Sequence, residues 1–299
     1  MRDIWISLRN SVLDALSGQT AAQILNDPPA GNLPVDRYAS DGDPAASLYR
    51  MARGMLSVAA TAGGRGVDYA RLRESPAYVD YRRATAALVD FDPASLPTRQ
   101  AQQAFWINLY NALIIDSVLT LNVKRSVTEG RLGILSFFRR TAYRVGALVV
   151  SADDIEHGIL RGNRGHPYLP GAHFRSDDPR CKWIIDPVDP RIHFALNCAS
   201  VSCPPIRFYA AHELDAQLDL AARNYINATT RCSSGSNTLE ISTLFRWYRM
   251  DFGSKADILA FVERYLAGES ACCPVLRHGD AVKLTFGSYN WALNIAGAA

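Results

Sequence analysis

The sequence predicts a mixed α/β protein of the α+β type, with a helix-rich N-terminal half packed on a small, mainly antiparallel sheet. Two observations carry this prediction. Apolar residues recur at helical spacing through the first 121 residues, whereas segments rich in β-branched and aromatic residues begin only near residue 142. These later segments are few and short, and helical patterns separate them.

The first third of the chain is predicted to be helical. Apolar side chains at helical spacing predict helices over residues 3–17 and 44–62, and a glycine-rich break follows at residues 63–66. A third helix is predicted over residues 75–89, because Pro76 would occupy the first turn, where proline is tolerated.

Residues 98–121 show the clearest helical pattern. Thr98 can cap the N-terminus, and the segment is apolar almost throughout, which predicts a buried helix. Asn108 and Asn111 share one face of it, and each buried amide costs about 1–3 kcal/mol unless it is hydrogen-bonded. The two amides are expected either to tie the helix to a neighbouring loop or to orient a catalytic group or a substrate.

The second half is predicted to alternate strands, helices and loops. Residues 143–150 predict a hairpin or a kinked strand around Gly146. Ser151 and Asp154 resemble a capping box at the start of a short helix over residues 152–161. The remaining elements are predicted to be a long loop at 162–190, a strand at 191–196, an irregular segment at 197–208, helices at 211–228 and 254–266, and strands at 239–242 and 282–286.

Length and charge define the broad class. Residues 1–74 are predicted to form a helical extension packed on a domain of residues 75–299 as one unit. The 32 basic and 29 acidic side chains give a net charge of +3, too small and evenly spread for a nucleic-acid surface. No apolar run is long enough to span a bilayer, and the N-terminus lacks the pattern of a signal peptide. A cytoplasmic protein without nucleic-acid or membrane partners is expected.

The 6 cysteines are too sparse for a disulfide framework, and the cytosol keeps thiols reduced, so no disulfide is expected. Cys198 stands out, because it would lie at the end of the predicted strand 191–196, in a turn of small residues. A rigid strand can position a nucleophile, and nearby backbone N–H groups can stabilise an oxyanion. An imidazole that lowers the pKa of the thiol would activate it. The helix at 152–161 supplies Glu156 and His157 for this purpose.

Two other interpretations stay open. His193, Cys198 and Cys203 form an H-x4-C-x4-C pattern, whose ligand types suit zinc although the spacing is unusual. The same segment could instead be the structural core of a non-catalytic binding module, since a cysteine after a strand is often a small buried hydrophobe. Motifs for nucleotide binding, for serine hydrolases and for zinc proteases are absent from the sequence.

Six motifs follow one another along the chain: residues 104–113 (AFWINLYNAL), 143–146 (YRVG), 155–161 (IEHGILR), 193–207 (HFALNCASVSCPPIR), 247–252 (WYRMDF) and 289–294 (YNWALN). In these motifs the sequence resembles the family of domain of unknown function 547 (DUF547). Ala199 is a departure, because the family pattern has glycine there; the change matters only if that backbone needs a positive φ.

The resemblance implies a shared fold more than an activity. Glu156, His157 and Cys198 fall on positions that the family retains, whereas His193 and Cys203 fall on positions that vary in plant members. This favours a Cys198–His157 pair over the zinc site. The outline is similar to papain-like and transglutaminase-like thiol enzymes, although in those enzymes the cysteine precedes the histidine.

The leading hypothesis is a thiol-dependent acyl-transfer enzyme acting on an amide, ester or thioester, with no metal or cofactor. Cys198 would be the nucleophile, His157 the base, and Glu156, Asn108 or Asn111 the orienting group. The backbone at Ser200 and Ser202 would hold the oxyanion, and Arg161 and Arg207 would contact the substrate, expected to be a small molecule or a peptide. The alternatives are a non-catalytic protein-binding module and a zinc protein using His193, Cys198 and Cys203.

Overall fold

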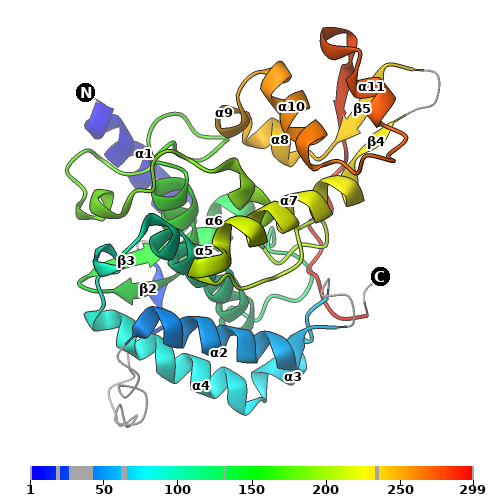
Figure 1. Ribbon diagram of the computed structural model, residues 1–299. Coiled ribbons are helices and arrows are strands. Elements are labelled where there is room, and N and C mark those ends of the chain that lie inside the picture. The colour runs from blue at the N-terminus through cyan, green and yellow to red at the C-terminus, as the bar shows by residue number, and fades with distance from the viewer. Residues whose placement is uncertain are drawn as a thin grey trace.

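The computed structural model describes residues 2–17, 21–26, 43–61, 66–130, 132–232 and 236–297. Its helices are α1 Arg2–Ser17, α2 Pro44–Ala59, α3 Tyr69–Arg73, α4 Pro76–Thr85, α5 Arg99–Thr120, α6 Ile134–Arg140, α7 Leu214–Thr229, α8 Leu244–Trp247, α9 Arg249–Phe252, α10 Lys255–Tyr265 and α11 Cys273–Leu276. Its strands are β1 Gln23–Ile24, β2 Thr141–Val145, β3 Leu148–Ser151, β4 Arg231–Cys232, β5 Thr238–Ile241 and β6 Lys283–Phe286. The predicted mixed α/β class is confirmed (Figure 1).

Helix α5 is the centre of the molecule. The hydroxyl of Thr98 accepts a hydrogen bond from the backbone N–H of Ala101 at 3.1 Å, which confirms the predicted cap. Every side chain from Gln103 to Leu119 is buried, so the helix has no solvent-facing side over this length. Helices α2 and α4 lie side by side, and α2 also packs against α5 (Figure 1).

Two small sheets lie apart in the chain. In the first, β1 pairs parallel with β2, and β2 pairs antiparallel with β3. In the second, β4 pairs antiparallel with β5, and β5 pairs parallel with β6. Each sheet is therefore mixed, where the sequence predicted one mainly antiparallel sheet. The predicted hairpin is confirmed, and Gly146 forms its turn with φ +54°, which favours glycine.

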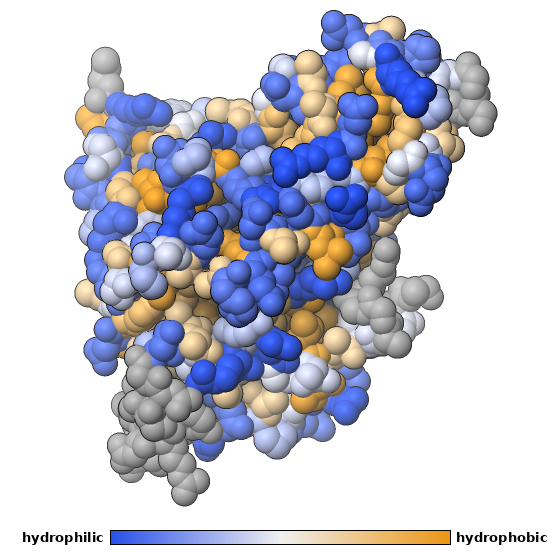
Figure 2. Space-filling view, viewed as in Figure 1, coloured by the Kyte–Doolittle hydropathy of each residue, from blue (hydrophilic) through white to orange (hydrophobic). Residues whose placement is uncertain are grey.

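The described residues bury two hydrophobic clusters. The larger one surrounds α5 and extends from Leu25 to Leu218, with Leu293. The second one lies in the C-terminal lobe, between α7, α10 and β5, and includes Ala222, Val262 and Leu239. Figure 2 shows hydrophilic and hydrophobic residues mixed over the face in view, with hydrophobic groups gathered on this lobe.

Helix α1 covers part of the long loop at residues 162–190. The guanidinium of Arg9 donates to the carbonyl oxygens of Pro170 at 2.9 Å and His173 at 3.4 Å. Asp3 accepts hydrogen bonds from the backbone N–H and the hydroxyl of Ser176. The predicted N-terminal extension thus holds a segment that leads toward the site described below.

The predicted strand at residues 191–196 is wrong. Residues Pro190–Phe194 form a 3-10 helix. Asp189 caps it by accepting from the backbone N–H of Arg191 at 3.0 Å, and Pro190 occupies the first position, where it has no N–H to leave unpaired. The Asp-Pro pair, which favours the start of a helix, therefore outweighs the strand-like composition of the residues that follow it. As a result, Cys198 does not lie at the end of a strand.

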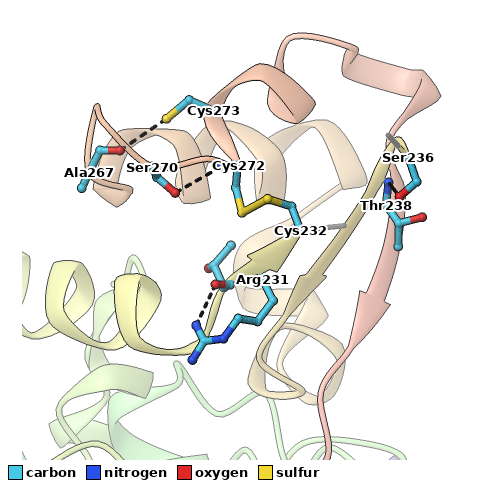
Figure 3. Close-up of a disulfide and its surroundings, with 9 residues drawn as sticks. Arg231, Cys232, Ser236, Thr238, Ala267, Ser270, Cys272 and Cys273 are labelled. Carbon is cyan, nitrogen blue, oxygen red and sulfur yellow. Dashed lines mark hydrogen bonds between the residues drawn. A yellow bond between two sulfur atoms is a disulfide. The ribbon is translucent and has the colours of Figure 1, made fainter. Parts of the chain in front are cut away.

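The expectation of no disulfide is also wrong. Cys232 at the end of β4 and Cys272 just before α11 are joined by a disulfide across 40 residues (Figure 3). The fold of the C-terminal lobe brings these two cysteines together, and their wide spacing gave no sign of it. The neighbouring Cys273 is a free thiol that donates to the carbonyl of Ala267 at 3.3 Å. In the described part of the chain, no helix is both long and apolar enough to cross a membrane.

Candidate functional site

The predicted short helix after residue 151 is a π-helix, Asp154–Leu160. Its capping box is present, because Ser151 Oγ accepts from the Asp154 N–H and Asp154 Oδ2 accepts from the Ser151 N–H. The wide turn buries Glu156 and His157 together. Gly158 has no room for a side chain, since a Cβ there would lie 2.3 Å from the ring of Phe174. Single π-helical turns of this kind are frequent at functional sites.

The asparagines of α5 hold the loop that carries Cys198. The hydrogen bonds of both side chains go to backbone groups of that loop and its ends, as expected if the two amides tie the helix to a neighbouring loop. Asn111 Nδ2 donates to the carbonyls of Ala195 at 2.9 Å and Arg207 at 3.0 Å, and Asn111 Oδ1 accepts from the Asn197 N–H at 2.9 Å. Asn108 makes two hydrogen bonds with the backbone of Tyr209: its Nδ2 donates to the carbonyl at 2.8 Å, and its Oδ1 accepts from the N–H at 2.7 Å. They position Cys198 through its loop.

The backbone turns sharply directly after Cys198. Ala199 has φ +64°, the left-handed region that costs a residue with a Cβ roughly 1–2 kcal/mol. Asn197 Oδ1 accepts from the Ala199 N–H at 2.7 Å and holds this turn. The position therefore does need a positive φ, which gives a physical reason for the glycine of the family pattern.

The thiols of Cys198 and Cys203 lie together at one tyrosine. Tyr289 OH lies 3.3 Å from Cys198 Sγ and 3.1 Å from Cys203 Sγ, and the Cys198 N–H donates to Cys203 Sγ at 3.0 Å. Ser200 Oγ lies 3.3 Å from Cys198 Sγ. Both cysteines are partly exposed. Tyr289 comes from the segment after β6, far away in the sequence.

This environment separates the pKa values of the two thiols. Burial acts to raise the pKa of Cys198, but hydrogen bonds from Cys203, Ser200 and Tyr289 outweigh it and lower that pKa below its ordinary value. Burial raises the pKa of Cys203 well above its ordinary value, and the hydrogen bond and charge of Cys198 add to the effect. Cys198 is therefore the thiol that ionises first.

Cys198 opens into a small pocket of about 60 Å³, which has room for a few water molecules. Aromatic and titratable side chains from many parts of the chain line it, including Tyr110, Asp153, Glu156, His157, His166, Tyr168, His193, Cys198, Cys203, Trp247, Tyr248, Tyr289 and Trp291. Three of the predicted catalytic residues, Cys198, His157 and Glu156, thus share one cavity.

The ring of His157 is held by its own helix. Arg161 Nη1 lies 3.1 Å from His157 Nδ1, and because a guanidinium only donates, Nδ1 must accept. The proton of the neutral ring is then on Nε2, which lies 3.9 Å from Asp153 Oδ1. Burial, with His166 and Arg161 nearby, lowers the pKa of His157 well below its ordinary value. His157 is neutral at pH 7, with both ring nitrogens turned to protein groups.

Arg161 is fixed inside the protein, where the sequence analysis expected a substrate contact. Its Nε donates to Asp251 Oδ2 at 2.5 Å and its Nη1 to the Gly165 carbonyl at 2.6 Å. Asp251 also accepts from His193 Nε2 at 2.9 Å and from Arg164 at 2.9 Å. Burial acts to raise the pKa of Asp251, but His193 and Arg161 hold it far below its ordinary range.

His193 is a second imidazole of the pocket. Its ring stacks on Tyr248 with centroids 3.8 Å apart. Because Nε2 donates to Asp251, the neutral ring keeps its lone pair on Nδ1. Burial lowers the pKa of His193, and Asp251 offsets part of that effect. Tyr248 in turn donates its hydroxyl to Glu156 Oε1 at 2.6 Å, so Glu156 is oriented by a tyrosine.

The other predicted substrate contacts lie elsewhere. The N–H of Ser202 donates to the Asn290 carbonyl at 3.3 Å, whereas the Ser200 N–H is among the donors to the Cys198 sulfur. Arg207 is exposed and lines a separate groove with Arg53. None of these observations tests a substrate contact, and these assignments remain predictions.

The described residues contain one group that could hold a metal ion, made of Asp153, His157 and His166, with ligand atoms within 4.8 Å of one another. The set His193, Cys198 and Cys203 does not form such a group in that part of the chain. Burial raises the pKa of Asp153 to about 7 and lowers that of His166 to about 3. Since Arg161 occupies His157 Nδ1, the neutral ring has no lone pair left for a cation at Nε2.

Sequence reasoning missed Asp251, Tyr248 and Tyr289. They lie within the motifs at residues 247–252 and 289–294, which was the one available sign of a role. The roles of these three residues depend on contacts with residues far away in the sequence.

The fold and the pocket define a mixed α/β protein with a cysteine pair in a histidine- and tyrosine-lined cavity. Residues 93–226 match the family model described as "Protein of unknown function, DUF547", which confirms the resemblance over that part of the chain. The match covers α5, the π-helix and the cysteine loop, but it ends before Asp251 and Tyr289. No curated protein and no solved structure matches the chain.

Proposed function

We propose that the protein is a thiol-dependent acyl-transfer enzyme that acts on an amide, ester or thioester of a small molecule or a peptide, with Cys198 as the nucleophile. The observation that carries the proposal is the lowered pKa of a partly exposed thiol inside a pocket. The thiolate would attack the carbonyl carbon and form a thioester, and the leaving amine, alcohol or thiol would take a proton. Water or a second nucleophile would then break the thioester.

His157 is the proposed base because it is a neutral ring of the same pocket; since Arg161 occupies its Nδ1 and its Nε2 carries the proton, it can accept a proton only when Nδ1 leaves Arg161. His193 is a second candidate for this role, favoured by one specific observation. Asp251 fixes His193 Nε2 as a donor and leaves its Nδ1 with a lone pair, whereas Arg161 occupies Nδ1 of His157. The pH dependence of acylation in His157→Gln and His193→Gln distinguishes them. Loss of the base removes the acid limb of the profile, where the rate falls as the base is protonated, whereas loss of a structural ring lowers the whole profile.

We also propose that the fold resembles that of papain-like and transglutaminase-like thiol enzymes. A buried helix beside a cysteine loop supports it, and α5 supplies such a helix through Asn108 and Asn111. His157 precedes Cys198 in this chain, so the resemblance would concern the arrangement in space and not the order along the chain.

The location belongs to the proposal as well. A cytoplasmic location was expected, but disulfides persist mainly in oxidising compartments, and Cys232 and Cys272 form one. We therefore favour an oxidising compartment. Cell fractionation with blocking of free thiols tests this: recovery of Cys232 and Cys272 as free thiols from living cells would contradict it.

The test of the enzyme proposal uses an activated acyl ester and an iodoacetamide probe on the reduced protein. We expect an acyl adduct on Cys198 and alkylation of Cys198 with an apparent pKa below the usual value of about 8.5 for a thiol. Cys198→Ala should remove both signals, whereas Cys181→Ala, which changes an outlying free thiol, should keep them. Adducts confined to Cys181 or Cys273 would refute the proposal.

The same experiments decide the two alternatives. A binding module predicts that Cys198→Ser and His157→Ala lower thermal stability while no acyl adduct forms on the parent protein. A zinc protein using His193, Cys198 and Cys203 predicts stoichiometric zinc in elemental analysis of the purified protein and loss of that zinc in Cys203→Ala.

A further inference from the structure

We propose that Cys198 and Cys203 are a redox pair, in which a small hydroperoxide oxidises Cys198 and Cys203 resolves the product to a Cys198–Cys203 disulfide. This goes beyond acyl transfer, because it needs only the two sulfurs and the access that the pocket gives. Four features of the described residues support it.

The first feature is the contact between the sulfurs. One hydroxyl, that of Tyr289, lies 3.3 Å from Cys198 Sγ and 3.1 Å from Cys203 Sγ, and the two thiols hydrogen-bond each other. A shared partner holds both sulfurs at one place. Disulfide formation requires the two sulfurs to be close to each other, and their mutual hydrogen bond places them so.

The second feature is the backbone between the two cysteines. The Cys198 N–H donates to Cys203 Sγ at 3.0 Å, and the Cys203 N–H donates to the Ser200 carbonyl at 3.0 Å. Asn197 Oδ1 accepts from the Ala199 N–H at 2.7 Å, and Asn197 Nδ2 donates to the Pro204 carbonyl at 2.5 Å. These hydrogen bonds hold the segment from Asn197 to Pro204 as a turn, with the sulfurs of Cys198 and Cys203 on the same side.

The third feature is the chemical difference between the thiols. Hydrogen bonds to its sulfur lower the pKa of Cys198, whereas burial raises that of Cys203. The more acidic thiol is the attacking one in thiol redox chemistry, and the less acidic one is a resolving thiol. Tyr289 can also donate a hydrogen bond to the oxygen that leaves the peroxide.

The fourth feature is the isolation of the pair from the other sulfurs. Cys181 donates to the carbonyl of Arg175, and Cys273 to the carbonyl of Ala267. Cys232 and Cys272 are already bonded to each other. Within the part of the chain that is described, Cys203 is the sulfur placed to resolve an oxidised Cys198.

The reaction balances in two steps. The Cys198 thiolate attacks one oxygen of the hydroperoxide, its O–O bond breaks, and Cys198 becomes a sulfenic acid while the other oxygen leaves as an alcohol or water. The thiol of Cys203 then attacks the sulfenic sulfur, an S–S bond forms, and water leaves. Two thiols are oxidised and one hydroperoxide is reduced. If the proposed acyl transfer is correct, the disulfide switches it off by consuming the nucleophile.

The experiment treats the full chain, with Cys198 and Cys203 reduced and the Cys232–Cys272 disulfide kept intact, with one equivalent of hydrogen peroxide. Free thiols are then blocked, and the non-reduced tryptic peptides are mapped by mass spectrometry. We expect the single peptide of residues 192–207, which contains both cysteines, to lack two hydrogens and to be restored by a reductant. In Cys203→Ala, the sulfenic acid on Cys198 should accumulate, and trapping by dimedone should rise about tenfold over the parent protein. Cys181→Ala is the matched control and should behave like the parent.

Three outcomes would overturn the redox pair: no oxidation of Cys198, stable sulfenic or sulfinic acid on Cys198 in the parent protein without a cross-link, or a cross-link from Cys198 to a different cysteine. The peptide mapping is done on the parent protein, so it tests the proposal even if Cys203→Ala does not fold. The acyl adduct on the reduced parent is scored separately. A cross-link without an acyl adduct would remove the proposed function and leave the redox pair standing.

Discussion

Asp251→Asn is expected to destabilise the protein by about 3–5 kcal/mol, the usual effect of removing one partner of a buried ion pair. The side chain of Asp251 is 0% exposed and that of Arg161 is 2% exposed, so the guanidinium would be left inside the protein without its counter-charge. An amide keeps the shape of the carboxylate but not its charge, and His193 and Arg164 lose the same partner. At about 2–4 °C per kcal/mol for chains of 150–250 residues, the melting temperature should fall by roughly 6–20 °C.

The pH dependence of this effect has a definite sign. Because the folded pKa of Asp251 lies below the unfolded value of about 3.9, its contribution to stability is complete above that pH and is lost as the pH falls further. The gap in unfolding free energy between the parent and Asp251→Asn should therefore be constant from about pH 5 to 8 and shrink toward pH 2.

Urea unfolding followed by circular dichroism measures the gap, with Asp280→Asn, a change at an exposed aspartate, as the matched control. A loss below about 1 kcal/mol at pH 7, or a gap that does not narrow in acid, would refute the assignment of Asp251 as the buried counter-charge.

Three other changes test separate parts of the structure. Asp153→Asn should stabilise the protein by a few kcal/mol at about pH 8 but not at about pH 4, because burial raises the pKa of Asp153 to about 7 and the folded state resists its ionisation; an equal effect in urea unfolding at both pH values would contradict this. Replacing Cys232 and Cys272 together by alanine should cost about 4 kcal/mol, and reductant should lower the melting temperature of the parent but not of the variant. Asn111→Ala should cost about 3 kcal/mol in denaturant unfolding, because it strands buried carbonyl and N–H groups of the cysteine loop, and a loss below about 1 kcal/mol would argue against that loop geometry.

Local signals made α5, the hairpin and the capped π-helix accessible to prediction. The cap at Thr98, the turn at Gly146 and the reciprocal bonds of Ser151 and Asp154 involve residues a few positions apart, so their chemistry is visible in the sequence. Neither the π form of the short helix nor the contact between Gly158 and the ring of Phe174 was visible in the sequence.

In residues 190–194 two local signals conflict, one for a helix and one for a strand. Asp189 and Pro190 are a helix start, with a capping side chain followed by a residue without an N–H, and the structure uses both in this way. The apolar alternation that follows favoured a strand. The helix start carried the more specific physical meaning.

The chemistry of the site could be predicted only in part. Cys198, His157 and Glu156 do share a pocket, but Asp251 reaches Arg161 across 90 positions and Tyr289 reaches Cys198 across 91. The disulfide likewise joins cysteines 40 positions apart. Such contacts are decided by tertiary packing, and a single aspartate, tyrosine or cysteine in a sequence carries no sign of its distant partner.

The burial of α5 on all sides sets the limits of any shortened form of the protein. Leu48 and Met55 of α2 belong to the same hydrophobic cluster as α5, and both lie outside residues 93–226. The hydroxyl of Tyr69 also donates to Asn294 Oδ1 at 2.7 Å, so residues 225 positions apart, on either side of the family match, are joined. A fragment cut at the borders of the family match would leave one side of its central helix in water. The cluster of side chains that buries α5 reaches from Leu25 to Leu293.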